Sequence, residues 1–444
     1  MTQPSRPRVL FCSTETRQKK QRGIYFYVKS LIAAVQAAGY DTALLTEAND
    51  HEHASLLTSR IYNTLYDPDE FTPGRARMLA RYLEHRGLRR LHARHVAHDR
   101  SMLTEEHLWF LRHFEHFVNV PRIYDTIELA TRLPLSPPVD LSFAADHGYN
   151  TVLTTAPTHV QTRRAGVKLV QTVHDLIPLQ VTLESNRADA FFRAIQSTVR
   201  HADLMIAISQ YTRDQLVQLF PEAAGRVKVI YQAIPADQRL IELSRQPLVQ
   251  QAVLDKFGLT ADHYGFYIGA IEPRKNIHRL ITAHHVVAKE ADCPLILAGP
   301  VNKKYAAEQG LKDILVPGRR SSGDQRDARY IGYVTEIEKL CLLRNARFFG
   351  FPTLNEGFGI PVLEAQTLGC PVLTSRVSSI PEVVADSAAL LEDPYNIDEM
   401  ASAIRRLMTD DAYREQLRAA GLQNAARFTQ ENFAAQVNDV LSSL

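Results

Sequence analysis

Two acidic residues flank a glycine-rich turn in the second half of the chain. Seven residues separate Glu356 from Glu364, and the turn between them offers four candidate backbone donors: Gly357, Phe358, Gly359 and Ile360. Carboxylates accept hydrogen bonds from hydroxyl groups, and the N–H groups of such a turn can donate them to an anion. A ligand that carries several hydroxyls and a diphosphate needs both kinds of partner. The pattern therefore indicates a nucleotide sugar.

The elements on either side of this turn are expected to place both carboxylates at one edge of a sheet. Residues 346–351 form an apolar run typical of a strand, and a helical apolar pattern begins near Pro361, with Glu364 in its first turn. In an open α/β sheet, ligands bind at the carboxyl ends of the strands. The alternative is an ordinary turn residue and an ordinary helix N-terminal acid, which the helix dipole favours in any case.

Two adjacent cations follow another strand-like run. Arg274 and Lys275 come shortly after Gly269, where the apolar run ends, and helical spacing starts at Asn276. Side chains at this position can converge with helix N–H groups on a diphosphate. The alternative is a pair of solvated cations that bind nothing.

A histidine ends a third strand-like run. His174 follows three β-forming residues and precedes Asp175, so we expect it at the carboxyl end of a strand. The functional interpretation is an imidazole that hydrogen-bonds the donor sugar, and the alternative is a structural histidine. Asp175 fits the acceptor of an Asx turn or a helix cap better than it fits a base.

Five ordered blocks resemble the retaining glycosyltransferases of family 4, which have the GT-B fold. They are residues 173–178, 269–276, 351–365, 378–383 and 388–394. Five blocks in the expected order are far more specific than a single acidic pair. The resemblance implies an α/β protein with two Rossmann-like doubly wound domains that face a central cleft, and a C-terminal helix that crosses back to the first domain.

The same resemblance implies roles for individual residues. It implies that Glu356 contacts hydroxyls of the donor sugar near the reacting carbon, and that Glu364 accepts hydrogen bonds from the ribose. The residues expected to be catalytic are Glu356, His174, Arg274 and Lys275. The residues expected to bind the nucleotide sugar are Gly269, Arg274, Lys275, Gly357, Phe358, Gly359, Ile360 and Glu364. Gly23, which follows the first strand-like run and its polar loop, is expected on the acceptor side.

The expected substrates follow from two of the blocks. Glu-Pro-Arg-Lys-Asn at 272–276, together with His-Asp-Leu-Ile-Pro at 174–178, is similar to a branch rich in mannosyltransferases of surface-polysaccharide assembly. GDP-mannose is therefore the expected donor, and a saccharide or lipid-linked saccharide is the expected acceptor. No metal cofactor is expected, because Asp67 and Asp69 flank a proline in a turn-like loop, and because Arg274 and Lys275 can neutralise a diphosphate.

The chain of 444 residues is too long for one core, so we expect two domains. The first, residues 1–240, would bind the acceptor and contain a helical insertion rich in Arg and His at about residues 50–140. The second, residues 241–427, would bind the nucleotide sugar, and residues 428–444 would form a helix that packs on the first domain. The opening strand–loop–helix–strand lacks G-x-G-x-x-G, which argues against a nicotinamide cofactor.

Composition narrows the class further. With 45% hydrophobic residues, 23% charged residues and a formal net charge of +2, the chain is typical of a globular protein, and nothing demands a nucleic-acid partner. The four cysteines lie apart in apolar runs, which favours buried free thiols. The first residues do not read as a secretory signal, and the chain has no apolar run of membrane-spanning length, so a cytoplasmic location is expected.

Basic stretches at residues 19–22 and 75–100 have two interpretations. One is a solvated helix face, and the other is peripheral contact with anionic lipid at the inner face of a membrane. Two further function classes also stay open, namely a sugar-nucleotide epimerase of the same fold and a catalytically silent glycan- or partner-binding protein.

Overall fold

The computed structural model describes residues 7–13, 23–49, 52–53, 57–58, 60–61, 93–97, 113–180, 185–235, 237–290, 293–311, 314–315 and 328–444. The chain divides into two compact units. Unit 1 comprises Met1–Ala233 and Gln430–Leu444, and unit 2 comprises Ile234–Thr429. The sequence predicts a boundary at residue 240, whereas the division by contacts falls at residue 233.

Unit 1 is built on one large twisted sheet. Among the described residues it has eight strands in the order β10-β9-β8-β6-β1-β2-β4-β3, and only β3 runs antiparallel to its neighbour. The strands are β1 (Arg8–Cys12), β2 (Asp41–Thr46), β3 (Arg94–Ala97), β4 (His116–Asn119), β6 (Thr151–Thr154), β8 (Lys168–Val173), β9 (Leu204–Ala207) and β10 (Val227–Val229). A separate small sheet pairs β5 (Val139–Asp140) with β7 (Val160–Gln161). Apart from the charged first residues of β1 and β8, strands β1, β6 and β8 are continuous apolar or uncharged runs, as expected of parallel strands covered on both faces.

Helices alternate with these strands. They are α1 (Gly23–Ala37), α5 (Ile123–Arg132), α6 (Ile177–Gln180), α7 (Ser185–His201), α8 (Gln210–Leu219) and α18 (Gln430–Ser442). From β6 the chain adds β8, β9 and β10 outward on one side, and from β1 it adds β2, β4 and the edge strand β3 on the other, with β3 preceding β4 in the sequence. The direction of winding therefore reverses between β1 and β6, which makes their carboxyl ends the ligand-binding edge of this unit.

The prediction of a helical insertion at about residues 50–140 is wrong in part. Residues 94–97 form the edge strand β3, which pairs antiparallel with β4, and residues 116–119 form β4 itself, which pairs with β2. Both strands are short and have few apolar residues, so they are stabilised by pairing with the rest of the sheet. Their own sequences therefore do not show the alternation of apolar and polar residues that predicts a strand. Most of the Arg- and His-rich stretch, Asp67, Asp69 and the basic residues at 19–22 lie outside the described residues.

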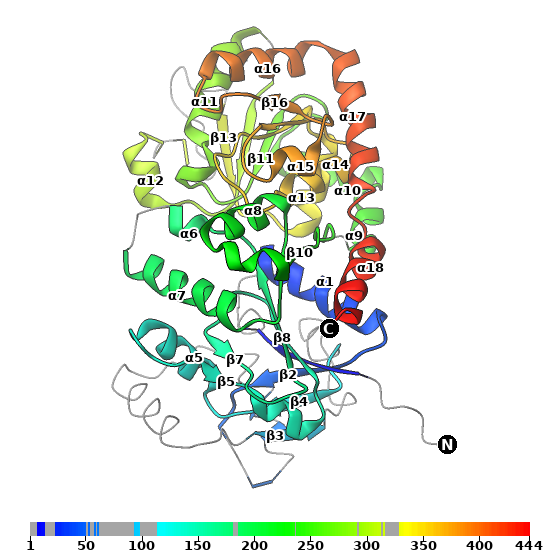
Figure 1. The fold of residues 1–444 in the computed structure, drawn as a ribbon. Helices are drawn as coiled ribbons and strands as arrows, with labels where there is room; N and C mark the ends of the chain where they lie inside the picture. The colour runs from blue at the N-terminus through cyan, green and yellow to red at the C-terminus, as the bar shows by residue number, and fades with distance from the viewer. Residues whose placement is uncertain are drawn as a thin grey trace. The chain divides into compact units, whose positions relative to one another are not determined.

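The last helix of the chain belongs to the first unit. In Figure 1, α18 (red) lies beside α1 (blue). The Phe433 ring is buried and meets the Tyr27 ring edge-on, with 5.9 Å between centroids. Gln430 Nε2 donates a hydrogen bond of 2.8 Å to the carbonyl of Ser30. Unit 1 is therefore completed by residues from the far end of the chain.

Unit 2 has a second, smaller parallel sheet. Among the described residues it has six strands in the order β13-β12-β11-β14-β15-β16. They are β11 (Gly265–Ile268), β12 (Leu295–Ala298), β13 (Ala328–Gly332), β14 (Phe348–Phe351), β15 (Val372–Ser375) and β16 (Ala389–Leu391). This is the strand order of a Rossmann fold, and the winding reverses between β11 and β14.

The helices of unit 2 follow the strands in turn. They are α9 (Gln238–Leu243), α10 (Pro247–Phe257), α11 (Ile277–Val287), α12 (Lys303–Glu308), α13 (Glu336–Asn345), α14 (Ile360–Thr367), α15 (Ile380–Val384), α16 (Ile397–Thr409) and α17 (Asp411–Ala425). Across both units the four cysteines are buried and free, which confirms the interpretation of their spacing.

Candidate active site

The reversal of winding in unit 2 brings two loops together. One follows β11 and contains Arg274 and Lys275, and the other follows β14 and contains Glu356. The backbone joins them, because the N–H of Leu354 donates a hydrogen bond of 2.7 Å to the carbonyl of Arg274. The hydroxyl of Thr353 lies 3.1 Å from the same carbonyl. A main-chain hydrogen bond and a threonine hydroxyl thus join the two loops, in addition to the contacts of the charged side chains.

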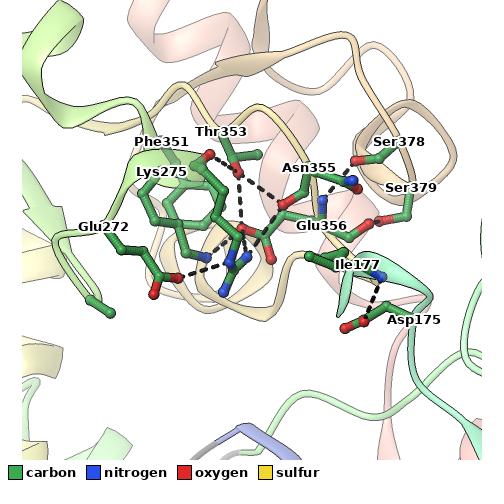
Figure 2. A network of polar contacts seen from close by, with 12 residues as sticks. Asp175, Ile177, Glu272, Lys275, Phe351, Thr353, Asn355, Glu356, Ser378 and Ser379 are labelled. Carbon is green, nitrogen blue, oxygen red and sulfur yellow. Dashed lines mark hydrogen bonds and ion pairs between the residues drawn. The ribbon is translucent and has the colours of Figure 1, made fainter. Parts of the chain in front are cut away.

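The carboxylate of Glu356 is the centre of this site. Its Oε1 accepts hydrogen bonds from Arg274 Nη1, at 3.0 Å, and from Lys275 Nζ. The hydroxyl of Thr353 lies 3.0 Å from the same oxygen, and Figure 2 shows Lys275 and Thr353 beside Glu356. Glu356 is only 8% exposed. Burial raises the pKa of this carboxyl, but the charges of Lys275 and Arg274 outweigh burial and leave the pKa below its usual value.

Lys275 is buried as deeply as its partner. Its ammonium lies 4.5 Å from the centroid of the Phe351 ring, and the side chain is in contact with Glu356. Burial lowers the pKa of Lys275, and the Glu356 carboxylate opposes that shift. Arg274 makes a further contact, because its Nε lies 2.8 Å from Glu272 Oε1. The structure thus places three predicted site residues together as one ion-paired cluster.

Two serines hold the backbone of Glu356. Its N–H donates a hydrogen bond of 2.9 Å to Ser378 Oγ, and its carbonyl accepts one of 2.9 Å from Ser379 Oγ. Both serines precede α15 and belong to a block on which the family resemblance rests, but sequence reasoning assigned them no role. Thr353 was missed in the same way. Hydroxyl residues are too common in turns for their type alone to mark a site.

The glycine-rich turn adopts a backbone that needs glycine. Gly359 has φ +107° and precedes the first residue of α14, and an added Cβ would lie 2.7 Å from Ile380 Cδ1. Phe358 is buried and meets the Phe428 ring edge-on at 5.7 Å. Gly357 is buried and Ile360 opens the helix. Their N–H groups as donors to a ligand stay a prediction, as does the role of Gly269, which lies just after β11 with φ +151°.

The expectation for Glu364 is wrong in one respect. Helix α14 begins at Ile360, so Glu364 is its fifth residue, and the first turn has no acid. Its side chain does not serve the helix N-terminus. Instead Glu364 Oε1 accepts a hydrogen bond of 2.8 Å from Lys339 Nζ on α13. This partner, 25 positions away, has no signal in the sequence.

His174 belongs to unit 1. It follows β8, is 8% exposed, and its Nε2 lies 2.8 Å from the carbonyl of Thr155. A carbonyl only accepts, so Nε2 carries the proton and Nδ1 is left with a lone pair. Burial lowers the pKa of His174 to about 4, so the imidazole is neutral at physiological pH.

The neighbours of His174 lie at the ligand-binding edge of unit 1. Asp175 Oδ1 accepts a hydrogen bond of 3.0 Å from the N–H of Ile177, which confirms the Asx turn and is drawn in Figure 2. The hydroxyl of Thr155 donates a 2.8 Å hydrogen bond to Ser13 Oγ, so residues that follow β1, β6 and β8 meet there. Gly23 is the first residue of α1, the helix that follows β1.

The described part of the chain lacks two kinds of feature, one for binding a metal and one for crossing a membrane. Within those ranges, no three or more His, Cys, Asp and Glu side chains are arranged to hold a metal ion. None of the described helices combines the length and the apolar composition needed to cross a bilayer.

Comparison with known proteins shows which proteins have a similar sequence and fold. The profile of "Glycosyl transferases group 1" matches residues 255–424, and that of "Glycosyltransferase Family 4" matches residues 76–238. Over its whole length the fold is similar to that of HepE from Anabaena, solved in complex with UDP and glucose. That similarity has a TM-score of 0.61 at 16% identity and covers 99% of this chain and 100% of that one. Two Rossmann-like units with these matches define the GT-B class of glycosyltransferase fold.

The two profiles match separate halves of the chain, and both describe glycosyltransferases. The chain is 34% identical to the O-antigen chain mannosyltransferase B of Escherichia coli over 246 residues. This aligned region covers 55% of this chain and 61% of that protein. It is also 31% identical over 273 residues to the serotype-specific mannosyltransferase WbdA of Escherichia coli, covering 60% of this chain and 32% of the relative. The matched region thus spans about three-fifths of the first relative and about one-third of the second.

Proposed function

We propose that this protein is a retaining glycosyltransferase that moves mannose from GDP-mannose to a saccharide or lipid-linked saccharide in polysaccharide assembly. The observation that carries the proposal is the cluster of Arg274, Lys275 and Glu356 at the point where the winding of unit 2 reverses. That point is where Rossmann-like sheets bind nucleotides. The E. coli relatives are named as mannosyltransferases, which supports mannose as the sugar.

The cluster suits the departure of a diphosphate. In the transfer, the bond between the anomeric carbon and the phosphate oxygen breaks, and a bond to the acceptor oxygen forms. The acceptor proton goes to the departing diphosphate. Arg274 and Lys275 offset the charge that develops on those phosphates, and Glu356 accepts a hydrogen bond from a hydroxyl of the sugar. Because fixed cations can fill this role, the proposal includes no metal ion.

The two units divide the substrates between them. Unit 2 would bind the nucleotide sugar through the loops after β11 and β14. Unit 1 would bind the acceptor near Gly23, and His174 would reach the donor sugar. The bound UDP and glucose in HepE support a nucleotide-sugar donor for a chain with this fold. Contact with anionic lipid is a further part of the proposal, which co-sedimentation with phosphatidylglycerol vesicles would test.

One experiment separates the candidate functions. The purified protein is incubated with GDP-mannose, UDP-glucose or ADP-glucose, with and without a mannose-containing oligosaccharide, and both products are measured by mass spectrometry. We expect GDP release that depends on the oligosaccharide, together with an oligosaccharide heavier by one hexose. An isomerised sugar nucleotide without GDP release would instead identify an epimerase. Binding of a sugar nucleotide with neither product would identify a silent binding protein.

Two additions test the finer parts of the proposal. The anomeric configuration of the product, measured by NMR, should match that of the donor, because the transfer retains it. Activity should persist in excess EDTA, since Arg274 and Lys275 neutralise the diphosphate. Loss of activity in EDTA and its recovery with magnesium or manganese would contradict the metal-free part alone.

A further inference from the structure

Lys339 and Glu364 form a second buried cation–carboxylate pair in unit 2. Lys339 Nζ lies 2.8 Å from Glu364 Oε1 and 2.8 Å from Glu336 Oε1. The side chains of Lys339 and Glu364 are only 13% and 11% exposed, whereas that of Glu336 is 41% exposed. The pair joins α13, which follows β13, to α14, which follows the glycine-rich turn.

The start of α13 holds Lys339 in place. Thr335 caps the helix in a capping box. Its hydroxyl accepts a hydrogen bond from the N–H of Glu338, and its own N–H donates a hydrogen bond of 2.8 Å to Glu338 Oε2. Lys339 is the next residue, so its backbone is fixed within the first turns of the helix. A long side chain on a rigid backbone loses less freedom when it binds a partner.

The charge on Glu364 depends on this lysine. Burial raises the pKa of the Glu364 carboxyl, and Lys339 is the cation that opposes the rise, while Glu336 adds to it. Burial alone would lower the pKa of Lys339, but Glu364 and Glu336 raise it, so the ammonium is charged at neutral pH. Without Lys339, a buried carboxyl would tend to take up a proton and stop acting as an anionic acceptor.

One oxygen of Glu364 is left for a ligand. Of the described residues, Lys339 alone donates a hydrogen bond to this carboxylate, and it does so at Oε1. A neutral acid offers a weaker acceptor than a carboxylate, because hydrogen bonds to charged groups are stronger than those between neutral groups. The ionisation of Glu364 therefore matters to any hydroxyl that it binds.

We propose that Lys339 is a positioning residue for the nucleoside half of the donor, which keeps Glu364 anionic and oriented to accept hydrogen bonds from the ribose hydroxyls. The inference rests on the proposed function. It differs from a purely structural pair that only joins α13 to α14, because it makes nucleotide binding by a Lys339 variant depend on pH.

The test measures the dissociation constant of GDP by calorimetry between pH 6 and pH 8.5. The chains compared are the unmodified protein, Lys339→Met, Lys339→Arg and Glu364→Gln. Lys304→Met removes an exposed lysine that pairs with Glu308 and serves as the matched control. The ratio of each variant's constant to that of the unmodified protein cancels the titration of GDP itself.

We expect Lys339→Met to bind GDP about tenfold more weakly at pH 6 and to recover as the pH rises and Glu364 ionises. Lys339→Arg should stay close to the unmodified protein, because it keeps the charge. Glu364→Gln should be weak at every pH and should lose the preference for GDP over 2′,3′-dideoxy-GDP. Inorganic pyrophosphate should bind equally to all of them, since it needs only Arg274 and Lys275.

The outcomes separate the two proposals. If neither GDP nor pyrophosphate binds the unmodified protein, the proposed function fails and this inference fails with it. If both bind but the Lys339→Met ratio is the same at every pH, the pair is structural and only this inference is overturned. Circular dichroism checks that Lys339→Met is folded. If Lys339→Met does not fold, Lys339→Gln, which keeps a polar side chain, is used in its place.

Discussion

The guanidinium of Arg274 lies 3.0 Å from the carboxylate of Glu356, although the two residues are 82 positions apart in the chain. Lys275 contacts the same carboxylate oxygen. In the free protein both cations are therefore paired with the Glu356 carboxylate. A bound phosphate must either share the cations with this carboxylate or displace it. Removing the acid and removing a cation should thus change nucleotide binding in opposite directions.

Glu356→Gln should bind GDP more tightly than the unmodified protein, by about tenfold, while it loses transferase activity. The reason is that Arg274 and Lys275 no longer neutralise a carboxylate and can attract the phosphates fully. Lys275→Ala should bind GDP at least tenfold more weakly. Thermal shifts with added GDP measure both effects. Equal weakening in the two variants would mean that the cations do not bind the diphosphate.

Gly359→Ala should destabilise unit 2 by about 1–3 kcal/mol. The added Cβ meets Ile380 Cδ1 at 2.7 Å, and φ +107° is unfavourable for alanine. Gly225→Ala is the matched control, because φ there is not positive and a Cβ would meet nothing within 4 Å. Urea unfolding followed by circular dichroism should show little change for the control. Similar stability of the two variants would contradict the strained turn.

His174 should make folding stability depend on pH between about 4 and 6.5. Its pKa is about 4 in the folded chain and about 6.5 when unfolded, so the unfolded chain binds the proton more readily in that window. Stability is then complete above pH 6.5 and falls with pH through the window, by up to about 3 kcal/mol.

The difference between the unmodified protein and His174→Gln isolates this contribution. Glutamine can still donate from Nε2 to the carbonyl of Thr155, but it does not titrate. The difference in urea midpoints between pH 7.5 and pH 5 should therefore be larger for the unmodified protein. An identical pH dependence in the two chains would show that the histidine is not held neutral.

Phe433→Ala should loosen the contact between α18 and α1 in unit 1. The ring is fully buried against Tyr27, and removal of a buried phenylalanine side chain costs about 3–5 kcal/mol. Amide hydrogen exchange across α1 should become faster. Asp439→Ala, on the exposed face of the same helix, should leave the exchange unchanged. Unchanged exchange in Phe433→Ala would mean that α18 does not stabilise this unit.

Much of the framework could be predicted because its signals are local. The apolar runs that end at Gly269 and Phe351 mark strands, and the residues that follow a parallel strand must lie at its carboxyl edge. Arg274, Lys275 and Glu356 could therefore be assigned to one region of unit 2. That they pair directly could not be predicted, since the type of a charged residue does not say which partner it has without a ligand.

The rest depends on contacts that no local pattern records. Lys339 reaches Glu364 from another helix, and Ser378 and Ser379 hold the backbone of Glu356 from a third segment. The helix that carries Glu364 begins one residue before the expected proline, which moves the acid into the second turn. The short strand β3 depends on an edge that its neighbours provide, so its own four residues do not mark it.

Because α18 belongs to unit 1 but ends the chain, unit 1 is completed only after unit 2 has been synthesised. A ribosome makes the eight-stranded sheet first, then all of unit 2, and only afterwards the helix that carries Phe433. The apolar face of α1 must therefore wait uncovered while almost two hundred further residues emerge, counted from Ile234–Thr429. Domains usually fold as they are made, but here the unit that starts first is finished last, and a stalled nascent chain would present that face to chaperones.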